Sequence, residues 1–348
     1  MKLNHFFCAN EHFGFQWLQT IGYLPSDSQI EDLKVTSASS FQKIETLKKT
    51  NITLLSALVT PNTDEDDLKL SSKLNAWLFI NDNLFDQKDS FCTKNLQISE
   101  KILQRYRIIF TSALQDISVS LSYDDLQLPH DVELKLRSLD TGLRDIGLCA
   151  SKLPEKIQER VIYGLDKYIK GVLQETYVRS SSADSSLSIS YDTFFSMRGN
   201  AGAVDWVFEL ALGLDKVELK EDVRKSELWK QFFKKAKYHI CLFNDIVSRN
   251  KEAEEESLDN FVLISESLWQ LTTRQAFSGT TTELDTSISE MLKLKLDLQS
   301  KFGDPITPAI SCIENWVVGH VIWELASFSG RHPKIPCISQ FESNLGWQ

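Results

Sequence analysis

Three oxygen-bearing side chains recur at every fourth position in the segment that follows the apolar run YHICL. Asn244, Ser248 and Glu252 would lie on successive turns of one helix, drifting only about 80° around its axis, so their oxygens line a single stripe. Oxygen-only ligands suit Mg²⁺, a hard cation that keeps several waters and shares its coordination with substrate phosphates. Lys251 lies beside the stripe, where its charge could neutralise phosphate. The stripe predicts a magnesium site for a phosphorylated substrate, with a polar face on a surface helix as the alternative.

A pair of carboxylates lies in the first third of the chain. Asp82 and Asp86 are four residues apart in the segment WLFINDNLFD, so a helix would place both on nearly the same side. Two like charges on an otherwise apolar helix repel each other unless cations compensate them, which makes a divalent metal the natural partner. A solvated helix face is the alternative that this segment alone leaves open.

Together, these two segments resemble the class I terpene synthases, whose aspartate-rich helix is followed later by the pattern (N/D)Dxx(S/T)xx(K/R)(D/E). Residues 244–252, NDIVSRNKE, agree with that pattern at every conserved position. The resemblance implies that Asn244, Ser248 and Glu252 chelate one Mg²⁺. It also implies that an aspartate-rich motif binds further ions, so that three Mg²⁺ ions together grip a prenyl diphosphate.

The aspartate-rich motif of this sequence departs from the family pattern DDxxD at one position. By resemblance, Asp82 is the principal metal ligand and Asp86 the second. Asn83 stands where the family has another aspartate that often pairs with an arginine. The resemblance implies that Asn83 weakens this polar network around the substrate more than it weakens the metal site.

The segment YDTFFSMRGNAG resembles the family's helix break, in which an arginine senses the diphosphate and a backbone carbonyl four residues later helps to trigger ionisation. The resemblance assigns these roles to Arg198 and Gly202. Gly199, Asn200 and Gly202 inside a helical pattern should loosen it and expose an orphan carbonyl. A surface arginine whose stem lies along the helix is the alternative for Arg198.

The C-terminal segment WVVGHVIW, residues 316–323, resembles the family's WxxGxxxW helix. Arg331 and His332 stand near the place where the family has an Arg-Tyr pair. The resemblance therefore implies that Arg331 donates hydrogen bonds to the diphosphate. His332, in place of the tyrosine, would contact the substrate.

The reaction implied by the resemblance breaks the C–O bond of an allylic diphosphate and leaves an allyl cation beside inorganic diphosphate. Arg198, Lys251 and Arg331 would add hydrogen bonds in a closed complex that excludes water. Aromatic faces stabilise a nearby cation by about 0.5 to 2 kcal/mol each, so we expect an apolar, aromatic cavity. For each candidate aromatic, ordinary core packing is the alternative. The candidates are Phe79, Phe85, Phe194, Phe195, Trp316 and Trp323.

The elements that position these residues are expected to be helices. The 348 residues include only 14 Gly and 8 Pro, which is too few turn-forming residues for an all-β fold. Apolar residues recur at helical spacing over 155–178, and similar stretches occupy 96–120, 191–212, 223–252, 257–276 and 306–328. The alternating leucines of MLKLKLDLQ are also interpreted as helix, because the segment has no β-branched residue. We predict one all-α domain over 1–348, a terpene synthase-like helical bundle around a central apolar cavity, with the resemblance strongest over 75–332.

The composition of the chain limits the classes of molecule that it is expected to bind. The net charge of −10 disfavours a nucleic-acid or anionic-membrane surface, and no window approaches a membrane span. The six cysteines are far apart and show no CxxC pair, which favours reduced thiols in the cytoplasm. The expected partner is a small prenyl diphosphate, and a homodimer is compatible with the sequence. Farnesyl diphosphate is the default substrate, by analogy with single-domain chains that lack a plastid-like leader.

The sequence also contains features of two other classes of prenyl-diphosphate enzyme and is compatible with a non-catalytic protein. Asp64–Asp67 contains DxDD, the acid motif of protonation-initiated cyclases, but acidic residues in a first helical turn are favoured by the helix dipole. A chain-elongating prenyl transferase would carry a second DDxxD where this sequence has NDIVSRNKE. A non-catalytic prenyl-diphosphate-binding protein is the alternative from a different class.

Overall fold

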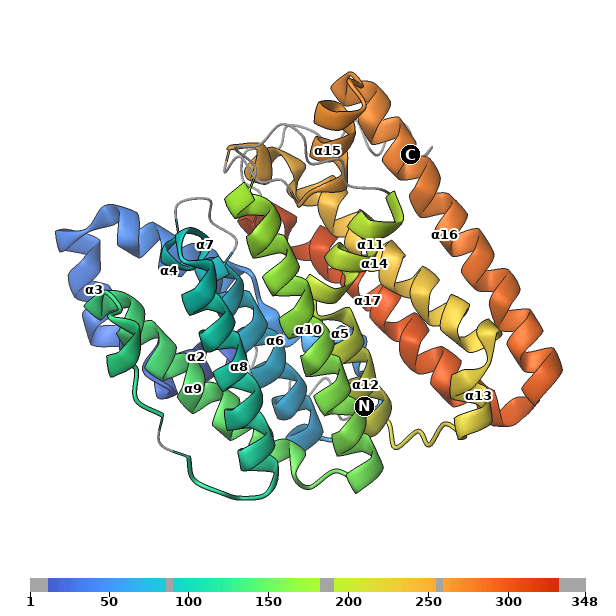
Figure 1. The fold of residues 1–348 in the computed structure, drawn as a ribbon, viewed down its shortest axis with the longest axis horizontal. Helices are drawn as coiled ribbons and strands as arrows, with labels where there is room; N and C mark the ends of the chain where they lie inside the picture. The colour runs from blue at the N-terminus through green and yellow to red at the C-terminus, as the bar shows by residue number, and fades with distance from the viewer. Residues whose placement is uncertain (1–11, 86–89, 120, 182–190, 255–258, 332–348) are drawn as a thin grey trace.

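The computed structural model describes residues 12–85, 90–119, 121–181, 191–254 and 259–331 (Figure 1). Within these ranges the regular structure is helical, as the composition predicts, and contains no strand. The first helices are short and lie ahead of the metal-binding segments: α2 (Phe13–Thr20), α3 (Asp27–Thr36), α4 (Ala38–Lys49) and α5 (Ile52–Val59).

The next helices form one half of the bundle, where Figure 1 shows α6, α8, α9 and α10 side by side. Their bounds are α6 (Glu65–Phe85), α7 (Phe91–Lys94), α8 (Leu96–Leu114), α9 (His130–Ala150) and α10 (Glu155–Ser181), with a short 3-10 turn η1 (Asp124–Leu126).

The C-terminal half of the described chain packs around α14, with α16 along the outer edge of the molecule (Figure 1). Its helices are α11 (Tyr191–Ala201), α12 (Val204–Leu214), α13 (Glu221–Lys225), α14 (Glu227–Glu254), α15 (Phe261–Leu268), α16 (Thr273–Phe302) and α17 (Thr307–Arg331), with η2 (Asp304–Ile306) before α17.

An aromatic cluster joins α6, α8, α10 and α12 at the centre of the core. The Trp77 ring meets Tyr106 at a centroid distance of 5.0 Å and Trp206 at 5.9 Å, both edge to face. Tyr168 lies 5.8 Å from Trp206. Trp77 also donates a hydrogen bond from Nε1 to the Leu139 carbonyl at 2.9 Å, which ties α6 to α9. These large buried side chains hold together the helices that carry the candidate site.

Two sequence predictions about helices have different outcomes. The leucine-rich segment is helical inside α16, where Leu294 and Leu298 are buried and Leu292 and Leu296 are exposed. The single helix predicted over 257–276 is wrong, because the chain forms α15 and then starts α16 anew. Thr272 begins α16 with a capping box, in which its side chain caps the first turn and Gln275 reaches back.

The acidic segment Asp64–Asp67 begins a helix, as the sequence predicts. Asp64 Oδ1 accepts a hydrogen bond from the Asp67 backbone amide at 3.1 Å, and α6 begins at Glu65. Its carboxylates lie at the opposite end of α6 from Asp82, so they are separate from the candidate metal site.

Candidate active site

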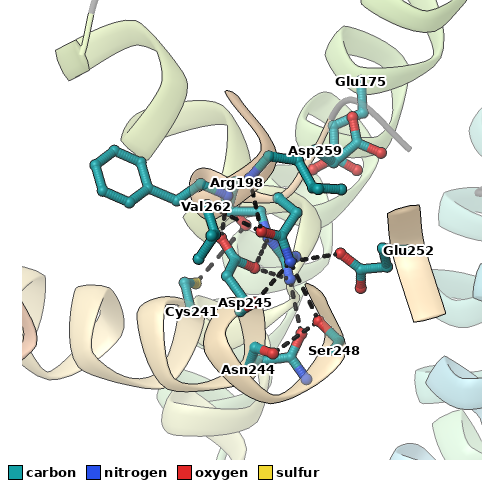
Figure 2. Close-up of polar contacts among 12 residues, drawn as sticks. Glu175, Arg198, Cys241, Asn244, Asp245, Ser248, Glu252, Asp259 and Val262 are labelled. Atoms are coloured by element: carbon teal, nitrogen blue, oxygen red, sulfur yellow. Dashed lines mark hydrogen bonds and ion pairs between the residues drawn. The ribbon is translucent and has the colours of Figure 1, made fainter. Parts of the chain in front are cut away.

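The stripe of oxygen ligands lies on α14, as its spacing predicts. Phe243 and Val247 bury the apolar side of this helix, while Asn244 and Glu252 are partly buried and Ser248 is buried. The Ser248 hydroxyl donates to the Asn244 carbonyl at 2.7 Å. Figure 2 shows the three side chains close to the same group of polar contacts. The helix therefore brings amide, hydroxyl and carboxylate oxygens onto one face.

Asn260 connects two members of this stripe with the start of the next helix. Its Oδ1 caps α15 by accepting from the Val262 and Leu263 amides at 2.9 and 3.3 Å. Its Nδ2 donates to Glu252 Oε2 at 2.8 Å and lies 3.4 Å from Ser248 Oγ. One N–H donor group thus meets oxygens of both Ser248 and Glu252. Hard oxygen donors that face a common point in this way fit a small cation such as Mg²⁺.

Arg198 points from α11 into the same cluster (Figure 2). Its Nη2 donates to Asn244 Oδ1 at 2.9 Å, and its Nε and Nη2 donate to Asp245 Oδ1 at 3.0 and 2.9 Å. Burial opposes the charge of Arg198, but the Asp245 carboxylate raises the pKa of the guanidinium well above its ordinary value. Burial raises the pKa of Asp245, while Arg198 and the Phe261 amide oppose that rise. Arg198 is an ion-paired arginine beside the stripe, not one on the open surface.

The helix break lies where the sequence predicts it. α11 ends at Ala201 and α12 begins at Val204, with Ala203 in the left-handed region at φ 56°. Gly202 N donates to Arg198 O at 2.9 Å, and the first bonds of α12 run to Ala203 O. Within the described residues, none of the backbone hydrogen bonds around the break is donated to the Gly202 carbonyl. This carbonyl is the group for which the family resemblance predicts a role in ionisation.

Asp82 stands near the end of α6 and is held by a relay of polar side chains. The Tyr168 hydroxyl lies 3.4 Å from Asp82 Oδ1 and accepts from Asn81 Nδ2 at 2.7 Å. Asn81 Oδ1 in turn accepts from the Tyr106 hydroxyl at 2.8 Å. Burial raises the pKa of Tyr106, so that its hydroxyl remains a donor. Asp82 is therefore attached to the core through groups on α8 and α10.

Arg179 joins the end of the aspartate-rich helix to the element that follows the stripe. Its Nη1 donates to the Phe85 carbonyl at 2.6 Å, and its Nε donates to Asp259 Oδ2 at 2.5 Å. Its Nη2 pairs with the same Asp259 oxygen and lies 3.4 Å from Glu175. Asp259 immediately precedes Asn260, which binds Glu252. This buried arginine links the two predicted metal-binding segments.

The candidate aromatic side chains are packed in the core. Phe79 is partly buried and meets the Trp323 ring edge to face at 5.5 Å. Trp316 is 5% exposed and contacts Phe208 at 6.1 Å. The others have at most 2% of their surface exposed: Phe85, Phe194, Phe195 and Trp323. Their contribution to a substrate cavity stays a prediction.

Several predicted residues lie partly or wholly outside the described part of the chain. Asp86 and His332 belong to the ranges that the structure does not describe. Asn83 lies in α6 and Arg331 is the last residue of α17, but only their backbone positions are described. Lys251 is exposed on the last turn of α14. Their roles in metal or diphosphate binding stay predictions.

Sequence reasoning missed Glu324 and Asn260. Glu324 is 0% exposed on α17 and accepts from Asn244 Nδ2 at 3.0 Å. No local signal points to Glu324, because it lies within an apolar helix 80 residues from its partner. Asn260 does carry a signal, since an asparagine directly before the apolar run FVLI is a typical helix N-cap.

A hollow of about 430 Å³ lies at the other end of the bundle. Its lining includes Asp67 near the start of α6, Pro154 before α10 and Gly213 near the end of α12. The predicted metal-binding residues lie instead toward the ends of α6 and α14.

Among the described residues, no group of three or more His, Cys, Asp or Glu is arranged to hold a metal. Each helix of the described chain is also too short or too polar to cross a membrane.

The family model described as "Terpene synthase family 2, C-terminal metal binding" matches residues 73–290. This range contains both predicted metal-binding segments and the helix break. Among curated protein sequences, none matches the chain.

The fold is similar to that of several solved structures. A mutant of the SVS_A2 protein from ancestral sequence reconstruction has 13% identity and a TM-score of 0.73, over 92% of this chain and 84% of that chain. Wild-type cucumene synthase has 13% identity and a TM-score of 0.66, over 91% and 95%. Germacradien-4-ol synthase from Streptomyces citricolor has 16% identity and a TM-score of 0.61, over 91% of each chain.

Proposed function

This chain belongs to the terpene synthase family, and from that premise we propose that it ionises a linear prenyl diphosphate with the help of Mg²⁺ and converts the resulting carbocation to a terpene. Farnesyl diphosphate is the proposed substrate and inorganic diphosphate the second product. We include three Mg²⁺ ions and a cytoplasmic location in this proposal. A homodimer stays a prediction.

The observation that carries the proposal is the convergence of the two metal-binding segments. Arg179 binds the end of the Asp82 helix and Asp259, and the next residue, Asn260, binds Glu252. Asp82 lies three residues before Phe85 on the same helix, so these contacts support a position of the Asp82 helix end near the stripe on α14. Such an arrangement suits a ligand that carries several negative charges, provided that cations accompany it.

Mg²⁺, when bound, supplies the positive charge that stabilises the departing diphosphate. Asn244, Ser248 and Glu252 would hold one ion, and Asp82 with Asp86 would hold others. The chain's own residues orient the leaving group. Arg198 already pairs with Asp245 beside the stripe, and it would also donate to a diphosphate oxygen. Helix packing would exclude water, which would otherwise capture the cation.

Incubation with prenyl diphosphates of ten, fifteen and twenty carbons, with and without Mg²⁺, tests this proposal. We expect a terpene hydrocarbon or alcohol from the fifteen-carbon substrate, detected in the headspace or extract, and none after chelation. In a parallel incubation that also contains isopentenyl diphosphate as the five-carbon co-substrate, a longer prenyl diphosphate as product would identify a chain-elongating transferase instead. Binding of the diphosphate without any product would identify a non-catalytic binding protein.

Glu252→Ala should reduce turnover by at least about 100-fold, because it removes the only carboxylate of the α14 stripe. Asn244→Ala should have a similar effect. Circular dichroism should show an intact fold in both variants. Glu227→Ala is the matched control, since Glu227 is a 75% exposed carboxylate on the same helix, and it should leave turnover unchanged. Full activity of Glu252→Ala would remove the assignment of the stripe.

A further inference from the structure

We propose that Glu324 is a positioning residue that determines which end of the Asn244 amide faces the metal. This inference rests on the proposed function, because it takes Asn244 as a ligand of Mg²⁺. It concerns a residue outside both metal-binding segments, on α17.

The Asn244 amide lies between one group that can only donate and one that accepts. Arg198 Nη2 donates to Asn244 Oδ1 at 2.9 Å. On the other side, Asn244 Nδ2 donates to Glu324 Oε1 at 3.0 Å. A guanidinium has no acceptor, and Glu324 Oε1 is here the acceptor. Only one of the two amide orientations satisfies both neighbours, and it directs Oδ1 toward Arg198.

Burial makes this preference strong. Glu324 is 0% exposed, and Arg198 has 15% of its side-chain surface exposed. Reversing the amide would set Nδ2 against the guanidinium and Oδ1 against the carboxylate. Mismatched polar groups are costly where water cannot replace the lost hydrogen bonds. Glu324 also lies one helical turn from His320, whose Nε2 is 3.5 Å from Glu324 Oε1.

The same geometry accounts for the use of an amide at residue 244. The pattern that the sequence resembles permits either asparagine or aspartate at this place. In this chain, an aspartate would set a carboxylate oxygen about 3 Å from Glu324 Oε1, in place of the N–H from which that oxygen now accepts, so two acceptors would face each other. Asn244 and Glu324 are therefore a matched donor and acceptor. If either side chain lost that role, the other would be left without its hydrogen-bond partner.

The pairing can be tested by exchanging the two groups, so that residue 244 carries the carboxylate and residue 324 carries the amide. Asn244→Asp alone should raise the Mg²⁺ concentration for half-saturation about 10- to 100-fold, the usual effect of disturbing a ligand's outer partner. Glu324→Gln should restore it in the double variant, because a glutamine can donate to the new carboxylate. We expect the double variant to return to within about threefold of the wild type. Glu324→Gln alone should have a small effect, since its amide oxygen can still accept from Asn244.

Calorimetric titration of Mg²⁺ in the presence of inorganic diphosphate measures the half-saturation without requiring turnover. Thermal unfolding of the metal-free protein adds a second readout, in which Asn244→Asp should lower the Tm and the double variant should recover it. Glu209→Gln is the matched control for loss of a buried carboxylate. Glu209 is 6% exposed and pairs with Arg224 at 2.8 Å, so this variant should lower the Tm and leave the half-saturation unchanged.

Two results would overturn the inference alone: wild-type half-saturation in Asn244→Asp, or no recovery in the double variant while the wild type binds Mg²⁺ and diphosphate. If the wild type itself fails to bind diphosphate with Mg²⁺, the proposed function fails and the inference fails with it. The two failures are therefore distinguished by the wild-type titration.

Discussion

At the scale of single residues, the candidate ligands depend on partners that have no metal-binding role of their own. Asp82 is supported by Tyr168, whose hydroxyl also accepts from Asn81 Nδ2 at 2.7 Å. Asn81 and Tyr168 are almost completely buried, at 0% and 1% exposure. A hydrogen bond in such a place costs more to break than one on the surface, because no water takes over the abandoned group.

Tyr168→Phe should lower the free energy of unfolding by about 1 to 3 kcal/mol, since it leaves the Asn81 amide without its acceptor. It should also reduce turnover, because Asp82 loses the hydroxyl beside it. Chemical denaturation and product formation measure the two effects. Tyr163→Phe is the control, as Tyr163 is a 46% exposed tyrosine on the same helix. Equal turnover of the two variants would show that the Tyr168 hydroxyl does not support Asp82.

At the scale of elements, two glycines of α10 permit the helix break to lie close against it. A Cβ on Gly171 would come within 2.2 Å of the Ala201 amide nitrogen, and one on Gly164 within 2.4 Å of the Trp206 Cα. These contacts flank the turn at Gly202 and Ala203. Backbone atoms cannot move aside as a flexible side chain can, so both positions require glycine.

Gly171→Ala should lower the free energy of unfolding by about 1 to 3 kcal/mol and displace the break that carries Gly202. We therefore expect loss of turnover as well as a lower Tm, measured by thermal denaturation and product formation. Gly279→Ala provides the control, because a Cβ there would meet no atom within 4 Å in the second turn of α16. That variant should be slightly stabilised by helix propensity. A neutral Gly171→Ala would contradict the close approach of α10 to the break.

At the scale of the whole molecule, the site and the hollow of about 430 Å³ lie toward opposite ends of the same helices. Buried charges elsewhere in the bundle affect its stability without taking part in the site. Asp140 on α9 is a partly buried carboxyl of this kind, and it accepts from the Tyr123 hydroxyl at 2.6 Å. Burial raises the pKa of Asp140 to about 6, although Tyr123 and two arginines oppose the rise.

The folded protein therefore holds a proton on Asp140 between about pH 4 and 6 that the unfolded chain has released. This contribution to stability is complete below pH 4 and is lost as the pH rises through 6. Asp140→Asn removes it, so the stability of the variant relative to the wild type should increase by about 2 kcal/mol between pH 4 and pH 7.

Denaturant unfolding at the two pH values measures this difference. Asp131→Asn, which changes a 75% exposed aspartate on the same helix, should show almost no difference between them. A constant stability difference for Asp140→Asn would mean that the folded protein does not raise the pKa of this carboxyl.

The sequence by itself determined the features that depend on neighbours a few residues apart. The stripe of Asn244, Ser248 and Glu252 follows from helical periodicity, and the break after Arg198 follows from clustered glycines, because both are local properties of the backbone. Helix ends were harder to predict: the expected 257–276 helix is interrupted, since Thr272 caps a new helix within a continuous apolar pattern.

Only the tertiary structure decided which distant groups meet these local features. Glu324 faces Asn244 across 80 positions, Tyr168 reaches Asp82 across 86, and Arg179 reaches Asp259 across 80. No periodicity relates such residues, because their contact depends on how α17, α10 and α15 pack against α14 and α6. The local pattern supplies the oxygens, whereas helix packing decides which donors, acceptors and charges orient them.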